Sequence, residues 1–314
     1  MGQSKSTEEK IKEERQMITN QMSSKCFPDV GIDKALLQFS GPRSLEKLNQ
    51  HYKKREMELN ENAAVWIKDL AEKLVGLLPI PDAAGLGSLV ISIVIDRSVA
   101  AIKPPEDSTD DLLNRIFAEE KASAVRDQMD EYLKRHLMHI RNKAELKSDI
   151  KHVERNLSFA LTQLKNSMLL DGQMSSRALR IWVNGAAFHV QMLIHLARLD
   201  GTRDSGPVRS IITTYQSNLE KLLSGYKEYK QSTVRVRKER DPNGFIDCYY
   251  VFDDETKSNV TISNMFDPSE VEEAYLSCML PNHEQIKKMR QHFSDVKENA
   301  ENLISQTASF TVPQ

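Results

Sequence analysis

The residues with the clearest chemical meaning are the first six of the chain, MGQSKS. They match M-G-x-x-x-[ST], the pattern in which Gly2 accepts a myristoyl group once Met1 has been removed. The transferase needs an unsubstituted α-carbon at this position and small polar residues after it. The pattern therefore predicts a myristoylated Gly2, and the alternative is an ordinary disordered terminus.

One myristoyl chain binds a bilayer only weakly, so stable attachment requires a second membrane signal. Cys26 is a candidate palmitoylation site, with a free cysteine as the alternative. A basic run further along the chain offers an electrostatic contact with anionic lipid. Its members are Lys230, Arg235, Arg237, Lys238 and Arg240. Alternating arginines are also typical of the solvated edge of a β-ribbon, and this alternative stays open.

The segment at residues 65–102 is strongly apolar and has the pattern of a helical hairpin around the sequence PIPD. Each arm is shorter than the roughly 17–25 residues that span a bilayer. We expect either the buried centre of a helical bundle or a sequestered hairpin that inserts into a membrane, as in helical pore-forming proteins. The candidate membrane-contact residues are Leu74, Leu77, Leu78, Leu86, Leu89, Ile91, Ile93 and Ile95.

Recognisable catalytic and metal-binding motifs are missing from the sequence. It contains no P-loop, HExxH or GxSxG pattern, and its three cysteines form no CxxC pair. The nearest approach to a metal site is His136 with His139, which lacks carboxylates at a suitable spacing. His189 and His195 are expected to be buried neutral imidazoles with backbone partners. We therefore predict no catalytic residue, no metal and no cofactor, and an enzyme is the third function class.

The composition restricts the class of protein further. The chain has 314 residues, a formal net charge of −2, 39% hydrophobic and 28% charged residues. These values argue against a disordered chain, a polytopic membrane protein and a nucleic-acid-binding protein. Because no apolar run begins the sequence, we expect no secretory signal. The predicted location is cytoplasmic and peripheral at the membrane, with lipid as a partner, an unidentified protein partner, and a homo-oligomer left open.

The spacing of apolar residues predicts the elements that would position these groups. From residue 44 to about 230, and again near the C-terminus, the spacing is that of amphipathic helices, and a first long helix is expected up to Pro79. At residues 232–263 the period changes to two around a DPNG turn, which predicts a β-hairpin or meander. We expect a mainly α protein: an elongated helical bundle with a central apolar helical hairpin and a small β insertion. Residues 1–43 would form a lipid-anchor and linker segment, and residues 44–310 the bundle domain.

The chain has a characteristic order of segments. A long charged helix comes first, and it is followed by the apolar sequence LLPIPDAAGLGSLVISIVI and by the late sequences DPNGFIDCYYVFDDETKSNVTISNMF and EEAYLSCMLP. In this layout, over roughly residues 45–310, it resembles the rapunzel and cephalotoxin-like proteins of fish and marine invertebrates. The resemblance implies a helical protein of poorly defined biochemistry, with secreted toxins among the relatives, and it carries over no site residue. The myristoylation pattern, in place of a secretory signal, favours an intracellular role.

Two hypotheses about function follow from the sequence. The leading one is a non-enzymatic, membrane-associated helical protein that is tethered by N-myristoylation and acts through protein or lipid contacts. The alternative is an α-helical pore-forming protein that inserts the 65–102 hairpin into a membrane.

Overall fold

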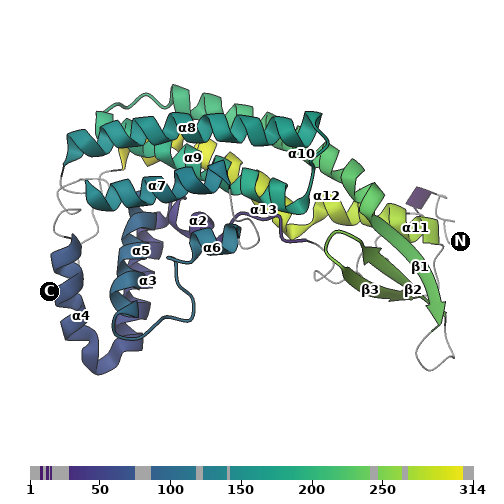
Figure 1. The fold of residues 1–314 in the computed structure, drawn as a ribbon, viewed down its shortest axis with the longest axis horizontal. Helices are drawn as coiled ribbons and strands as arrows, with labels where there is room; N and C mark the ends of the chain where they lie inside the picture. The colour runs from purple at the N-terminus through teal and green to yellow at the C-terminus, as the bar shows by residue number, and fades with distance from the viewer. Residues whose placement is uncertain are drawn as a thin grey trace, which may run out of the picture. The chain divides into compact units, whose positions relative to one another are not determined.

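The structure is a computed structural model of the chain. It describes residues 8, 9, 12, 13, 15, 28–74, 86–117, 123–139, 142–240, 247–263 and 268–306. Over these residues the protein is mainly helical with a small antiparallel sheet (Figure 1), which confirms the predicted class and the β insertion.

The chain forms two compact units that alternate along the sequence. Unit 1 combines residues 1–30, 167–179 and 220–288, and unit 2 combines residues 31–166, 180–219 and 289–314. Residues 31–43 thus belong to unit 2, and the predicted division into an anchor segment and a bundle domain stays a prediction.

Unit 2 begins with short and medium helices. These are α2 (Lys34–Phe39), α3 (Ser44–Leu59), η2 (Asn60–Asn62), α4 (Ala63–Leu74), α5 (Leu86–Ala100) and α6 (Leu112–Ile116). The single long helix expected from residue 44 is wrong, because Asn60 has a positive φ of 46°, which no α-helix accommodates. The apolar helix α5 packs against α2, α3 and α4, and Figure 1 shows it running beside α3.

Further helices follow. They are α7 (Ala124–Met138), α8 (Lys143–Leu170), α9 (Ser176–Asp200), α10 (Gly206–Thr233), α13 (Glu284–Glu298) and α14 (Ala300–Ser305). Helices α8, α9 and α10 are the longest of the described residues. A glycine in the left-handed region lies just beyond the end of α8 and of α9: Gly172 and Gly201, with φ of 70° and 69°. Within unit 2, Gly185 allows close packing of α9: a Cβ there would lie 2.7 Å from Val125 of α7 and 2.8 Å from Leu161 of α8.

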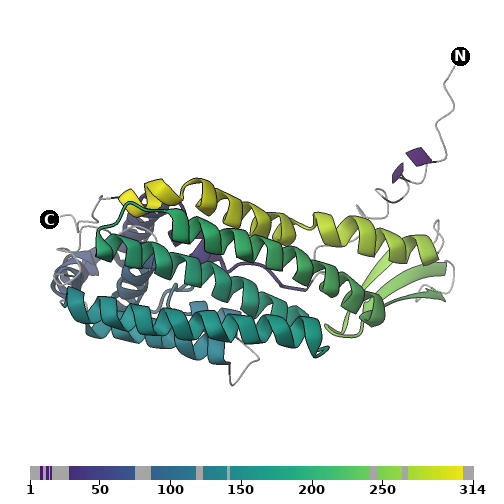
Figure 2. The same cartoon turned by 90° about the horizontal axis from the view of Figure 1, so that it is seen from above.

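Unit 1 contains the sheet, which is an antiparallel meander of β1 (Val234–Arg240), β2 (Asp247–Asp253) and β3 (Ser258–Ser263) in the order β1-β2-β3. Helix α11 (Pro268–Glu273) packs against β1, as Figure 2 shows. A π-helical segment, η3 (Ala274–Met279), and α12 (Leu280–Asn282) follow. The helical segment over residues 268–282 is therefore interrupted by a wider turn.

Candidate functional site

The predicted lipidation sites, Gly2 and Cys26, lie outside the described residues, as do Leu77 and Leu78 of the apolar hairpin. Leu86 is the first residue of α5, and its side chain is not among those described. The other hairpin candidates have exposed fractions of 0–4%: Leu74, Leu89, Ile91, Ile93 and Ile95. In this conformation, protein covers these five apolar side chains.

The residues of the basic run differ in their exposure and in the face of β1 on which they lie. Arg235, Arg237 and Lys238 are exposed on β1, and the strand alternation puts the two arginines on the opposite face from Lys238. Arg240 is the last residue of β1, and its side chain is outside the described set. The inclusion of Lys230 in a basic surface is wrong, because this side chain is fully buried.

Lys230 instead belongs to an internal ion cluster of unit 1. Its Nζ donates to Asp253 at 2.6 Å and to Glu255 at 2.5 Å. The cation also lies 5.5 Å from the ring centroid of Tyr226, whose hydroxyl is 2.6 Å from Ser176 Oγ. Because ionised groups are rarely buried without such partners, this cluster is best explained as structural.

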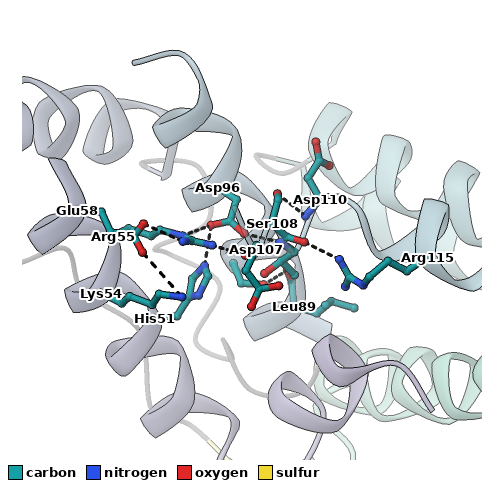
Figure 3. A network of polar contacts seen from close by, with 12 residues as sticks. His51, Lys54, Arg55, Glu58, Leu89, Asp96, Asp107, Ser108, Asp110 and Arg115 are labelled. Carbon is teal, nitrogen blue, oxygen red and sulfur yellow. Dashed lines mark hydrogen bonds and ion pairs between the residues drawn. The ribbon is translucent and has the colours of Figure 1, made fainter. Parts of the chain in front are cut away.

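A polar cluster that the sequence did not reveal is centred on Asp96 of α5 (Figure 3). Asp96 is fully buried, and its Oδ1 accepts a hydrogen bond from Arg55 Nε at 2.7 Å and lies 2.9 Å from His51 Nε2. Its Oδ2 accepts the backbone N–H of Thr109 at 2.5 Å. Asp96 therefore joins α5 to α3 and to the loop before α6.

The electrostatics of the cluster favour ionised groups. Burial alone would raise the pKa of Asp96, but the contacts with His51 and Arg55 and the hydrogen bond from Thr109 outweigh it and lower the pKa to about 2. Burial also opposes the charge of Arg55, yet its hydrogen bonds to Asp96 and Glu58 raise its pKa. At neutral pH, Asp96 is thus a fixed carboxylate and has no proton to donate.

A cavity of about 160 Å³ lies beside this cluster, between α2, α3 and the loop before α6. Its cationic lining residues are Lys34, Lys54, Arg55 and Arg115. Each one faces a carboxylate: Lys34 pairs with Asp107, Lys54 with Glu58, Arg55 with Asp96 and Arg115 with Asp33. Because each of these cations is matched by a carboxylate, the four pairs together carry no net charge. The arrangement ties α5 to α3 and to the loop before α6.

Arg115 completes this part of the network from α6. Its guanidinium donates to both carboxylate oxygens of Asp33, at 2.8 and 2.9 Å, and to the carbonyl of Ser108 at 2.7 Å. Asp33 also caps α2, since it accepts the backbone N–H of Ala35 at 2.8 Å. The loop before α6 is therefore bound at two points, by Asp96 at Thr109 and by Arg115 at Ser108.

His189 and His195 are buried, as predicted, but their partners are side chains and not the backbone. His189 lies between Tyr215 and Glu154, at 2.9 and 2.8 Å. His195 Nδ1 is 2.8 Å from the hydroxyl of Tyr132. The prediction of backbone partners is wrong, because each imidazole faces a neighbouring helix across the core of unit 2.

His136 stacks on His195, with ring centroids 5.1 Å apart. Burial lowers the pKa of His136 to about 4, and burial, with His136 and Arg198 nearby, lowers the pKa of His195 well below its usual value. His139, the other member of the considered metal pair, instead lies 2.5 Å from Asp149. Among the described residues, no group of three or more His, Cys, Asp or Glu side chains could hold a metal ion.

The length and apolarity required for a membrane-spanning helix do not occur together in any helix of the described residues. Comparisons with protein-family models, curated proteins and solved structures find no match to this chain. The resemblance to the rapunzel and cephalotoxin-like proteins accordingly stays a prediction.

Proposed function

We propose that this protein is a non-enzymatic helical protein that a myristoyl group on Gly2 tethers to the cytoplasmic face of a membrane, where it acts through protein or lipid contacts. We also propose that α4 and α5 form the central apolar hairpin of the helical bundle in unit 2.

The burial of α5 is the observation that carries this proposal. Apart from Arg97 and Ala100, its described side chains from Gly87 onward are buried, and Asp96 bonds to α3 and to the loop before α6. Insertion of this helix into a bilayer would expose Asp96 or break its hydrogen bonds, and both are costly in a medium without water. A membrane contact that leaves the fold intact is therefore better made by a lipidated terminus.

The polar clusters support the non-enzymatic part of the proposal. Asp96 accepts a hydrogen bond from Arg55, and Lys230 donates one to Asp253. His189 lies within about 3 Å of the carboxylate of Glu154, and His195 within about 3 Å of a tyrosine hydroxyl. Each cluster thus has a structural explanation in the stabilisation of buried polar groups. This is the pattern expected of a protein that acts by contact.

The test is membrane fractionation of the full chain produced in a eukaryotic cell, with the variant Gly2→Ala beside it. The tether predicts that the unaltered protein floats with membranes and that most of the Gly2→Ala protein moves to the soluble fraction with an unchanged circular dichroism spectrum. The neighbouring change Gln3→Ala leaves the glycine in place and should preserve flotation. Equal flotation of Gly2→Ala, or a soluble unaltered protein, would contradict the proposal.

A further inference from the structure

One face of the sheet in unit 1 combines arginine and aromatic side chains. The register pairs Arg235 with Phe252 and Arg237 with Tyr250, so these four residues share a face. The Arg237 guanidinium lies 5.3 Å from the centroid of the Phe252 ring, and the rings of Tyr250 and Phe252 are 6.0 Å apart. Both arginines are exposed, and both aromatic residues are half-buried.

The opposite face of the same sheet supplies the packing. Val234, Tyr249 and Val251 point to that face and have exposed fractions of 3–7%. The stability of the sheet therefore depends on those residues. The arginines of the arginine–aromatic face are exposed, so their substitution is expected to leave the fold intact.

The arginine–aromatic face also carries positive charge. Arg235 lies 2.9 Å from Asp254, but its side chain is 60% exposed, so this is a weak surface pair. No carboxylate among the described residues pairs with Arg237, which is stacked on an aromatic ring instead. The β3 residues opposite the two aromatics, Thr261 and Asn259, are exposed and uncharged.

We propose that this face, formed by Arg235, Arg237, Tyr250 and Phe252, contacts the headgroups of anionic lipid in a membrane. A guanidinium binds phosphate and carboxylate groups through paired hydrogen bonds, and tyrosine and phenylalanine rings are suited to the boundary between water and acyl chains. The inference rests on the proposed tether, for which the face is the second signal that a single myristoyl chain requires. Two arginines without a basic groove are a poor match to a nucleic-acid backbone, and the net charge of −2 provides no general attraction to one.

The experiment uses the full chain made in bacteria that lack an N-myristoyltransferase, so that any binding is independent of Gly2. Sedimentation measures its partition onto vesicles of phosphatidylcholine alone and of phosphatidylcholine with phosphatidylserine. We expect binding to the anionic vesicles only, a loss of about fivefold for Arg237→Gln, and weakening by added salt. Phe252→Ser should weaken binding as well, because it removes the ring under Arg237.

Lys238→Gln is the matched control, since it removes the same charge from the next residue of β1, on the other face. Its binding should stay within twofold of the unaltered protein. Three results would overturn the inference: no partition onto anionic vesicles, an equal loss for Lys238→Gln and Arg237→Gln, or binding to single-stranded RNA in preference to vesicles. Failure of the tether appears separately, in the flotation of the cell-made protein, because this experiment contains no acylated chain.

Discussion

Replacement of Asp96 by asparagine tests the most consequential contact in unit 2. Asparagine has nearly the same size and shape as aspartate, so the change removes the charge with little effect on packing. Arg55, of which 1% is exposed, would then face a neutral partner in the core, with only Glu58 left as a carboxylate ligand. The perturbation is therefore electrostatic and local.

The size of the effect follows from the lowered pKa of Asp96 and from the cost of breaking a buried ion pair. Lowering of the pKa of Asp96 from 3.8 to about 2 means that the fold stabilises its ionised form by roughly 2–3 kcal/mol. Removal of one partner of a buried ion pair costs about 3–5 kcal/mol in other proteins. We expect Asp96→Asn to lower the free energy of unfolding by about 3 kcal/mol at pH 7.

The pH dependence has a definite sign. Because the folded pKa of Asp96 lies below the unfolded value, its contribution is complete above about pH 5 and is lost as the pH falls through 3.8 towards 2. The difference between the unaltered protein and Asp96→Asn should therefore shrink below about pH 4. Urea unfolding followed by tryptophan fluorescence measures it, since both tryptophans, Trp66 and Trp182, are buried in unit 2.

The matched control is Asp110→Asn, which breaks the surface pair with Arg97, one residue after Asp96. These two side chains are 37% and 49% exposed, so the loss should be below about 1 kcal/mol. A loss below about 1 kcal/mol for Asp96→Asn as well, or a loss that is the same at pH 7 and pH 3, would mean that the charge of Asp96 does not stabilise unit 2.

Three further substitutions test the packing and the buried charges. Gly185→Ala brings a methyl group to 2.7 Å from Val125, and we expect a loss of about 1–3 kcal/mol in urea unfolding. His136 has a pKa lowered to about 4 by burial, so the unfolded chain binds a proton first as the pH falls below about 6.5. The contribution of His136 to the free energy of unfolding should decline by about 1.4 kcal/mol per pH unit from pH 6.5 to 4, and His136→Phe should remove this part of the pH dependence. Lys230→Met leaves Asp253, 4% exposed, without its buried cation, and should cost about 3–5 kcal/mol.

Each of these changes has a control outside the core. Gly41→Ala adds a methyl group where no atom lies within 4 Å. His152→Phe and Lys221→Met repeat the other two changes on exposed side chains. The controls should stay within about 0.5 kcal/mol of the unaltered protein. Equal losses in a buried variant and its control, or an unchanged pH slope in His136→Phe, would contradict the account.

The spacing of apolar residues predicted helices and strands correctly where the same spacing continued over many residues. The helical spacing expected between residues 44 and 230 holds without a break over α8, and the change to a period of two became the meander β1-β2-β3. The break after α3 was missed because the sequence Asn-Glu-Asn contains neither glycine nor proline. Asparagine adopts positive φ more readily than most residues with a side chain, so Asn60 was the one local signal of the break.

The Asp96 cluster was missed for a different reason. His51 and Arg55 are 45 and 41 residues away from it, and nothing local indicates which acid they meet. One pattern in the sequence was available: His51 and Arg55 fall in the apolar stripe of α3 that includes Leu48 and Leu59, and α5 carries Asp96 directly after an apolar run. A polar pair in a core-facing stripe, together with an isolated acid in an apolar helix, indicates a buried ion pair.

Lys230 was grouped with the arginines of β1 because it is near them in the sequence. Its spacing of four residues from Tyr226 places both side chains on the buried side of α10, and the acidic partners come from the end of β2 and the turn after it. Helical position was the better guide to its role than proximity to other cations.

The intact mass of the full chain purified from a eukaryotic cell shows whether Gly2 carries a lipid. We expect the mass of a chain that has lost Met1 and gained one myristoyl group, and the unacylated mass for Gly2→Ala. A chain of unacylated mass from the same cells, with Gly2 still present, would contradict the proposed lipidation of Gly2.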